Sequence, residues 1–175
     1  AVHTLSQEAT DMHENAREAI ARFVNARDSA EIVFVRGTTE AINLVAYSWG
    51  LRNLKSGDEV LVSLMEHHSN IVPWEILSKI NGFSVKYAEV NSDGTLNYED
   101  FESKFSRKTK IACLSQVSNV SGVINDVKRV AKVAHDHGAL MLVDGAQSVP
   151  HIPVDVQDLD VDFLAFSGHK MLGPT

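Results

Sequence analysis

The chain has 175 residues and one cysteine, with 44% hydrophobic residues, 22% charged residues and a formal net charge of -7 at pH 7. This is the composition of an ordinary one-domain globular protein, and the negative charge, without a dense Lys/Arg stripe, argues against a nucleic-acid partner. No apolar run approaches the ~20 residues that cross a bilayer, so no membrane partner is expected, and the N-terminal residues lack the plan of a secretory signal. A single cysteine fits a reducing compartment, so a cytoplasmic location is expected.

Helical and strand-like patterns alternate along the chain. Apolar residues at helical spacing predict an amphipathic helix over residues 8–24. Pro73 falls in the first turns of a later helical stretch, where proline is tolerated, and Gly138 is placed to end another helix. After the first helix, the predicted elements are strand 31–36, helix 38–51, strand 59–64, helix 69–80, strand 83–90, helix 97–105, strand 110–117, helix 126–138, strand 139–146 and strand 161–167.

This alternation predicts an α/β fold of three layers, in which a mainly parallel sheet is covered by helices on both faces. The segments LMLVD and FLAFS are apolar almost throughout, as strands covered on both sides should be. Ligands of such sheets bind at the carboxyl ends of the strands. The residues that follow each predicted strand are therefore the candidates for a functional site.

Two of these strand ends offer a turn and a histidine pair. Gly37 allows a tight turn, after which Thr38 and Thr39 open a helix whose N–H groups and hydroxyls either bind an anion or serve only as caps. His67 and His68 follow the next strand and are either ring-stacking residues or ordinary polar loop residues. A zinc site is not expected, because no cysteine or acidic residue lies at metal-ligand spacing from them.

Amide and carboxyl groups follow the next strand ends. Asn119 is placed either to hydrogen-bond a ligand or to form an Asx turn. Asp144 follows an apolar strand, so its carboxylate needs a positive or donating partner, although a helix N-cap is the alternative. Gln147 lies three residues further on and can face the same pocket.

The last predicted strand ends at Ser167, and Gly168, His169 and Lys170 follow it. Lys170 is either a solvated surface lysine or an amine with a chemical task. Together the strand ends supply a lysine, a buried acid, a planar ring and an anion-binding helix end. Pyridoxal 5'-phosphate needs this set for its aldehyde, ring nitrogen, ring face and phosphate. A nucleotide would not explain Lys170 and Asp144 together.

The motifs that carry these residues resemble a known family. GTTEAIN, EHHSNIVPW, NSDGTL, QVSNVSG, LVDGAQSVPHIPVDVQDLDVDF and FSGHKMLGPT are similar to those of class V aminotransferases, a group of fold-type I pyridoxal-phosphate enzymes. Within the group, they look most like cysteine desulfurases of the sulfur-mobilisation type, which are related to selenocysteine lyases. The resemblance covers nearly the whole chain and implies that residues 1–175 form part of the cofactor-binding large domain.

The resemblance also implies a role for each candidate residue. Lys170 would form the Schiff base with the cofactor and shuttle the proton, His67 would stack over the ring, and Asp144 would pair with the ring nitrogen. The other implied contacts are Gln147 and Asn119 at the ring hydroxyl, and Thr39, Ser167 and His169, with Thr38 close by, at the phosphate. No direct role is implied for His68.

The implied reaction converts L-cysteine to L-alanine and passes the sulfur to an enzyme cysteine as a persulfide, then to a sulfur-acceptor protein for iron–sulfur cluster or other sulfur assembly. The implied parent enzyme is a homodimer. Family members run about twice this length, so the chain is expected to be a fragment without the next sheet strand and the C-terminal small domain. Cys113 lies inside a predicted strand and is expected to be structural.

Two alternatives stay open. In the first alternative, the parent enzyme is a selenocysteine lyase or another class V enzyme. In the second, the chain is a non-catalytic α/β module that only oligomerises, through the sheet edges that a missing strand would expose.

Overall fold

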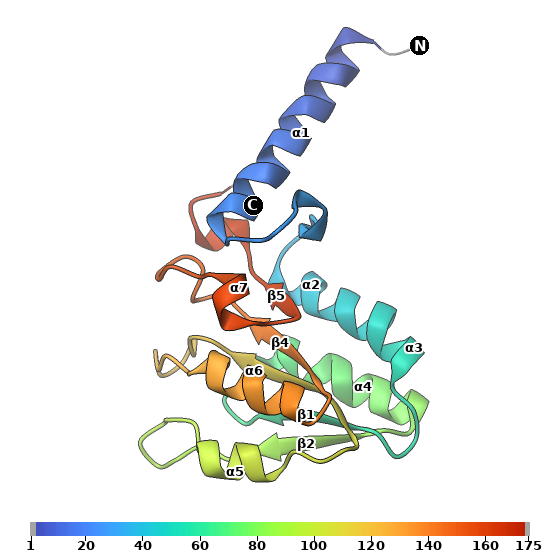
Figure 1. The fold of residues 1–175 in the computed structure, drawn as a ribbon, viewed down its shortest axis with the longest axis vertical. Helices are drawn as coiled ribbons and strands as arrows, with labels where there is room; N and C mark the ends of the chain where they lie inside the picture. The colour runs from blue at the N-terminus through green and yellow to red at the C-terminus, as the bar shows by residue number, and fades with distance from the viewer. Residues whose placement is uncertain (1–2, 174–175) are drawn as a thin grey trace.

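The computed structural model describes residues 3–173 as an α/β fold built on one five-stranded sheet (Figure 1). All neighbouring strands are parallel, in the order β2-β1-β3-β4-β5. The predicted architecture is therefore confirmed. The strands are β1 (Glu59–Ser63), β2 (Ser84–Ala88), β3 (Thr109–Ser115), β4 (Leu140–Asp144) and β5 (Phe163–Ala165).

The helices follow the predicted order, with local differences. The predicted helix 38–51 is confirmed but contains a π-helical turn, and α7, only four residues long, was too short to show periodicity in the sequence. Pro73 lies in the first turn of α4, and Gly138 follows α6 in the left-handed conformation, as expected. The helices are α1 (Thr4–Phe23), α2 (Thr38–Val45), α3 (Leu51–Asn53), α4 (Val72–Asn81), α5 (Tyr98–Ser103), α6 (Val127–Asp136) and α7 (Val156–Leu159), and the shorter turns are η1 (Ser29–Glu31), η2 (Ala46–Gly50), η3 (His68–Asn70) and η4 (Gly168–Lys170).

Helices cover both faces of the sheet, and the strands bury side chains on both sides. Along β1, Val60 and Val62 pack with Ile42 of α2 and Trp74 of α4. Leu61, between them, packs on the opposite face with residues from α5 and α6. Because successive side chains of a strand point to opposite faces, a strand between two helical layers must be apolar throughout.

The predicted strand 31–36 is wrong. Glu31 ends the turn η1, and the chain from Ile32 to Arg36 runs without regular structure. Val33 and Phe34 are 64% and 42% exposed. An apolar segment becomes a strand only where a neighbouring strand pairs with its backbone groups, and none of the five strands within residues 3–173 does so.

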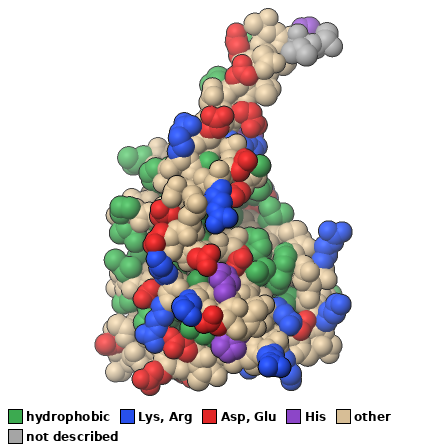
Figure 2. Space-filling model, in the orientation of Figure 1, with side chains coloured by type: hydrophobic (Ala, Val, Ile, Leu, Met, Phe, Trp, Pro, Cys, Tyr) green, Lys and Arg blue, Asp and Glu red, His purple; other side chains and the backbone are tan. Residues whose placement is uncertain are grey.

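The long first helix projects from the rest of the protein (Figure 1). The predicted helix 8–24 is confirmed, and α1 begins at Thr4, earlier than expected. Ala21 is its one buried residue, whereas Leu5 and Met12 are 78% and 74% exposed. Figure 2 shows acidic side chains along the projecting part. The helix is therefore held to the body mainly by its last turns.

None of the helices within residues 3–173 combines the length and the apolar character that crossing a membrane requires.

Candidate active site

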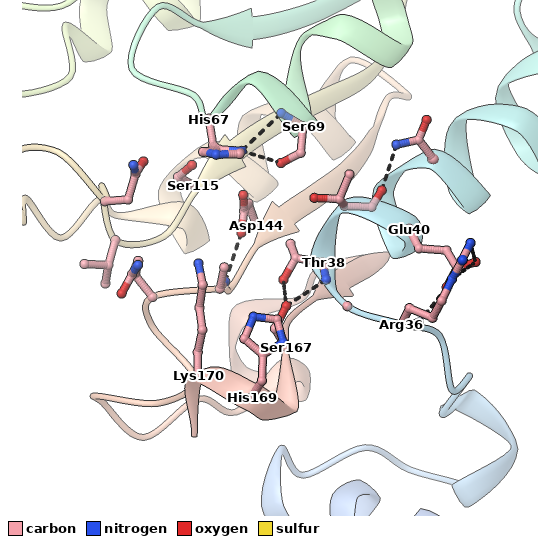
Figure 3. A pocket seen from close by; sticks show the side chains of 17 residues that line it. Arg36, Thr38, Glu40, His67, Ser69, Ser115, Asp144, Ser167, His169 and Lys170 are labelled. Atoms are coloured by element: carbon pink, nitrogen blue, oxygen red, sulfur yellow. Dashed lines mark hydrogen bonds and ion pairs between the residues drawn. The ribbon is translucent and has the colours of Figure 1, made fainter. Parts of the chain in front are cut away.

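A cavity of about 730 Å³ opens at the carboxyl ends of the strands (Figure 3). It is lined by every strand-end candidate from the sequence except His68, which lies in a neighbouring groove. The candidates that line it are Gly37, Thr38, Thr39, His67, Asn119, Asp144, Gln147, Ser167, His169 and Lys170. Seven further lining residues were not predicted: Arg36, Glu40, Asn43, Ser69, Ser115, Val117 and Ala146.

The strand order explains why these residues meet. From β1 the chain passes to β2 on one side, and then to β3 on the other side of β1. The loops that leave β1 and β3 therefore diverge and leave a crevice at the carboxyl edge, which is where ligands bind in open α/β sheets. His67 follows β1 and Asn119 follows β3, so the two residues lie on either side of this crevice.

Asp144 is the buried acid of the cavity. It is the last residue of β4, is 5% exposed, and stands in register with Ser115 on one side and Ala165 on the other. Its Oδ1 accepts a hydrogen bond from the backbone N–H of Ala146 at 2.9 Å. Burial raises the pKa of Asp144, and this backbone bond and the positive charge of Lys170 only partly oppose the rise. A turn follows it rather than a helix, so the N-cap alternative is not observed.

His67 is held by the residue two positions further on. Its Nδ1 lies 2.8 Å from the hydroxyl oxygen of Ser69 and accepts from the Ser69 backbone N–H at 3.2 Å. Because a backbone N–H only donates, Nδ1 must be the acceptor nitrogen, and Nε2 carries the hydrogen in the neutral ring. The ring is exposed and lines the cavity.

Lys170 reaches the same space from the opposite wall. It ends the turn η4, and its side chain points toward the region between Asp144 and His67 (Figure 3). The side chain is exposed, so within the described residues the amine is accessible rather than desolvated. The environment provides an acid near the lysine and a ring across from it.

The N-terminus of α2 forms the remaining wall. The backbone N–H of Thr38 donates to Ser167 Oγ at 2.8 Å, and the two hydroxyl oxygens are 2.7 Å apart. Gly37 has φ +148°, and a Cβ there would lie 3.1 Å from Ser167 Oγ. The position therefore favours glycine for both conformation and space. The N–H groups of this helix end are suited to an anion.

An exposed ion pair lies at the rim of the cavity. Arg36 and Glu40 are 3.0 Å apart, and the Arg36 side chain is 90% exposed. Glu40 also accepts from the backbone N–H of Arg36, the residue before the N-cap Gly37, so its carboxylate holds both ends of Arg36. The arginine and the glutamate four residues apart were a signal for this pair in the sequence. The ion pair itself contributes little to stability because it is solvated.

The comparison with protein families shows which family has this fold. The model of the family described as "Aminotransferase class-V" matches residues 1–175. The chain belongs to the class V aminotransferase family.

Several members of this family with curated names are similar over 174 residues. A protein of Halalkalibacterium halodurans named "Probable cysteine desulfurase" is 57% identical, and a cysteine desulfurase of Escherichia coli is 52% identical. Each match covers 99% of this chain and 43% of the relative. The chain therefore spans less than half the length of the curated relatives that it matches.

Solved structures agree with the whole described fold. The cysteine desulfurase CsdA of Escherichia coli matches with a TM-score of 0.92 and 41% identity, covering 100% of this chain and 44% of that one. The apo cysteine desulfurase of Thermococcus onnurineus matches with a TM-score of 0.94 and 42% identity, covering 100% and 43%. The structure titled "SspA in complex with cysteine" matches with a TM-score of 0.92 and 29% identity, covering 100% and 50%.

Proposed function

We propose that the chain supplies the cofactor-binding and lysine-bearing part of a cysteine desulfurase that uses pyridoxal 5'-phosphate. The observation that carries this proposal is the meeting of Lys170, Asp144 and His67 in one cavity beside the N-terminus of α2. The names of the relatives at 52% and 57% identity support the reaction class. The structure titled as a complex with cysteine supports L-cysteine as the substrate.

The residues present fit this cofactor. Asp144 is a buried carboxylate with a raised pKa, and a cationic ring nitrogen beside it would offset the cost of its ionisation. Lys170 offers an accessible amine for the aldehyde, and the helix end near Thr39 offers N–H groups for the phosphate. When bound, the cofactor supplies an electron sink for the carbanion that forms at the substrate α-carbon.

Each side chain then has a distinct task. Lys170 Nζ would anchor the cofactor and would take the proton from the substrate α-carbon. Asp144 would hold the ring nitrogen protonated through its negative charge, and His67 would cover the ring and shield it from water. Asn119 and Gln147 would hold the ring hydroxyl, while Thr39 and His169 would hold the phosphate. Ser167 and Thr38 fix the helix end against β5.

The sulfur-accepting thiolate is proposed to come from residues that this chain does not contain. Its one cysteine, Cys113, is fully buried in β3, and burial raises the pKa of its thiol well above the usual value. The thiol is therefore neither accessible nor ionised. Transfer of the persulfide sulfur to an acceptor protein, for iron–sulfur cluster or other sulfur assembly, a homodimeric state and a cytoplasmic location belong to the same proposal.

Reduction with borohydride tests the proposal directly. The full-length protein is loaded with pyridoxal 5'-phosphate and reduced, and the modified peptide is identified by mass spectrometry. We expect the label on Lys170, and none on this peptide in the Lys170→Arg variant, which keeps the charge. A label on any other lysine would refute the assignment. Alanine formation from L-cysteine and from L-selenocysteine then distinguishes the two substrates.

A further inference from the structure

Glu66 is a buried acid beside the cavity that the proposed mechanism does not use. It is 7% exposed and precedes His67 directly, and it lines the neighbouring groove rather than the cavity. Its carboxylate accepts three side-chain hydrogen bonds. The donors are Ser63 Oγ at 2.6 Å, Asn70 Nδ2 at 2.7 Å and Ser115 Oγ at 2.7 Å.

The three donors belong to three separate elements. Ser63 is the last residue of β1, Ser115 is the last residue of β3, and Asn70 ends the turn η3. All three are buried. One carboxylate therefore joins the two strand ends on either side of the crevice to the turn that lies above them. Burial raises the pKa of Glu66, and the hydrogen bonds from its three partners oppose that rise, so every donor of the junction depends on this one carboxyl group.

The junction controls the turn that holds the His67 ring. η3 is a single 3-10 turn of three residues, and such short turns have poor hydrogen-bond geometry of their own. Ser69, which binds His67 Nδ1, is its middle residue. The backbone N–H of Asn70 donates to the His67 carbonyl at 2.8 Å, and the Asn70 side chain is tied to Glu66. Movement of Asn70 would therefore move Ser69 away from the ring.

We propose that Glu66 is a positioning residue, which fixes the orientation and the tautomer of His67 through Asn70 and the turn η3. The role of His67 as the ring cover rests on the proposed function, whereas the effect on its tautomer does not. Without the carboxylate, the turn loses its tie to β1 and β3, and Ser69 no longer holds a hydrogen-bond donor against Nδ1. His67 then samples both tautomers and several ring orientations.

The decisive variant is Glu66→Leu, which keeps roughly the size of the side chain. Leucine has no acceptor atom, so the Ser63, Asn70 and Ser115 side chains all lose their shared partner. The matched control is Glu59→Leu. Glu59 is a similarly buried glutamate at the other end of β1, where it accepts from Ser106 at 2.6 Å and pairs with Lys86 at 2.9 Å.

The tautomer is read by nitrogen NMR on full-length protein labelled with 15N-histidine, with the His67 signals assigned from a His67→Gln spectrum. In the cofactor-free wild type we expect one protonated Nε2 and one unprotonated Nδ1. In Glu66→Leu we expect both signals to move toward the average of the two tautomers. Glu59→Leu should keep the wild-type pattern even where its melting temperature falls as far. A wild-type pattern in Glu66→Leu would overturn the proposal.

A second measurement separates this inference from the proposed function. With pyridoxal 5'-phosphate added, the visible circular dichroism of the bound ring should fall in Glu66→Leu and not in Glu59→Leu. If the wild type binds no cofactor, the proposed function fails while the tautomer result still decides the role of Glu66. If Glu66→Leu does not fold, Asn70→Ala replaces it. Asn70→Ala should disturb the His67 signals and Ser115→Ala should not, and two unchanged spectra would overturn the inference.

Discussion

The backbone N–H of Thr38 donates to the hydroxyl of Ser167, 129 positions later in the chain, at 2.8 Å. Both residues are buried, and their hydroxyl oxygens lie 2.7 Å apart. This contact joins the N-terminus of α2 to the segment that directly follows β5. The end of α2 that is proposed to hold the cofactor phosphate is therefore fixed in place by a side chain.

Removing this hydroxyl should destabilise the protein. In Ser167→Ala the buried N–H of Thr38 loses its acceptor, so we expect the free energy of unfolding in urea to fall by about 1–3 kcal/mol. The control is Ser103→Ala, whose hydroxyl is exposed and donates to the carbonyl of Asp100 in the same helix. That change should stay within about 0.5 kcal/mol of wild type. Equal losses in the two variants would contradict the role of Ser167.

Asp144 is expected to reduce the stability of the cofactor-free protein at neutral pH. Burial raises its pKa above the ordinary 3.8, so the folded chain holds the proton more tightly than the unfolded chain does. Stability contributed in this way is present below pH 3.8 and is lost as the pH rises through the folded pKa. Asp144→Asn, which keeps an oxygen for the Ala146 N–H, should therefore be more stable than wild type at neutral pH, with a smaller difference in acid. Urea unfolding without cofactor measures this, and a less stable variant at neutral pH would be inconsistent with it.

His135 should make the folded protein less stable as the pH rises above neutrality. Its hydrogen bond to Asp162 at 2.9 Å is the main cause of a raised pKa, and Asp160 adds to the effect. The stability that it contributes is fully present below pH 6.5 and is lost as the pH rises through the folded pKa. His135→Gln should flatten this part of the pH profile of the melting temperature. A profile as steep in His135→Gln as in the wild type would contradict this role.

Cys113 should not react with thiol reagents in the folded protein. The side chain is fully buried in β3, and burial raises the pKa of its thiol. Because the thiolate is the reactive form, an aromatic disulfide reagent should release no colour from this residue until denaturant is added. Rapid labelling of the native chain would show that β3 opens easily and would reopen Cys113 as a sulfur acceptor.

The outer edge of β5 should promote self-association of the 175-residue chain on its own. This strand has three residues and ends the sheet, with no further strand beside it within residues 3–173. Unpaired edges pair with other chains. Light scattering should give a mass that increases with concentration. A constant monomer mass over the range would contradict the expectation.

The sequence predicted most of the sheet because burial and periodicity are local properties. β3 and β4 are buried on both faces, and their apolar runs lead to Asn119 and Asp144 at the cavity. The error at residues 31–36 has a non-local cause, since the pattern of a strand does not reveal whether a partner lies beside it. The roles given to the cavity residues stay predictions.

The contacts of Glu66 also depend on non-local geometry. Its partner Ser115 lies 49 positions away and reaches it only because β3 pairs directly with β1. The motif around Glu66 attracts attention to the two histidines that follow, and nothing in the residue order marks the glutamate as the buried junction. Likewise, the exposure of Lys170 depends on what covers the cavity, which the residues around Lys170 do not specify.

The tie between Thr38 and Ser167 has a consequence for biosynthesis. The cavity is lined by both Thr38 and Ser167, which are 129 positions apart in the chain. A nascent chain that ends before Ser167 therefore cannot form the cavity. At ~5–20 residues per second, the ribosome needs roughly 6–26 s to pass from one residue to the other. During that time the helix end of α2 is present without the strand that holds it. The proposed binding of the cofactor at this site therefore waits for the synthesis of β5 and of the residues that follow it.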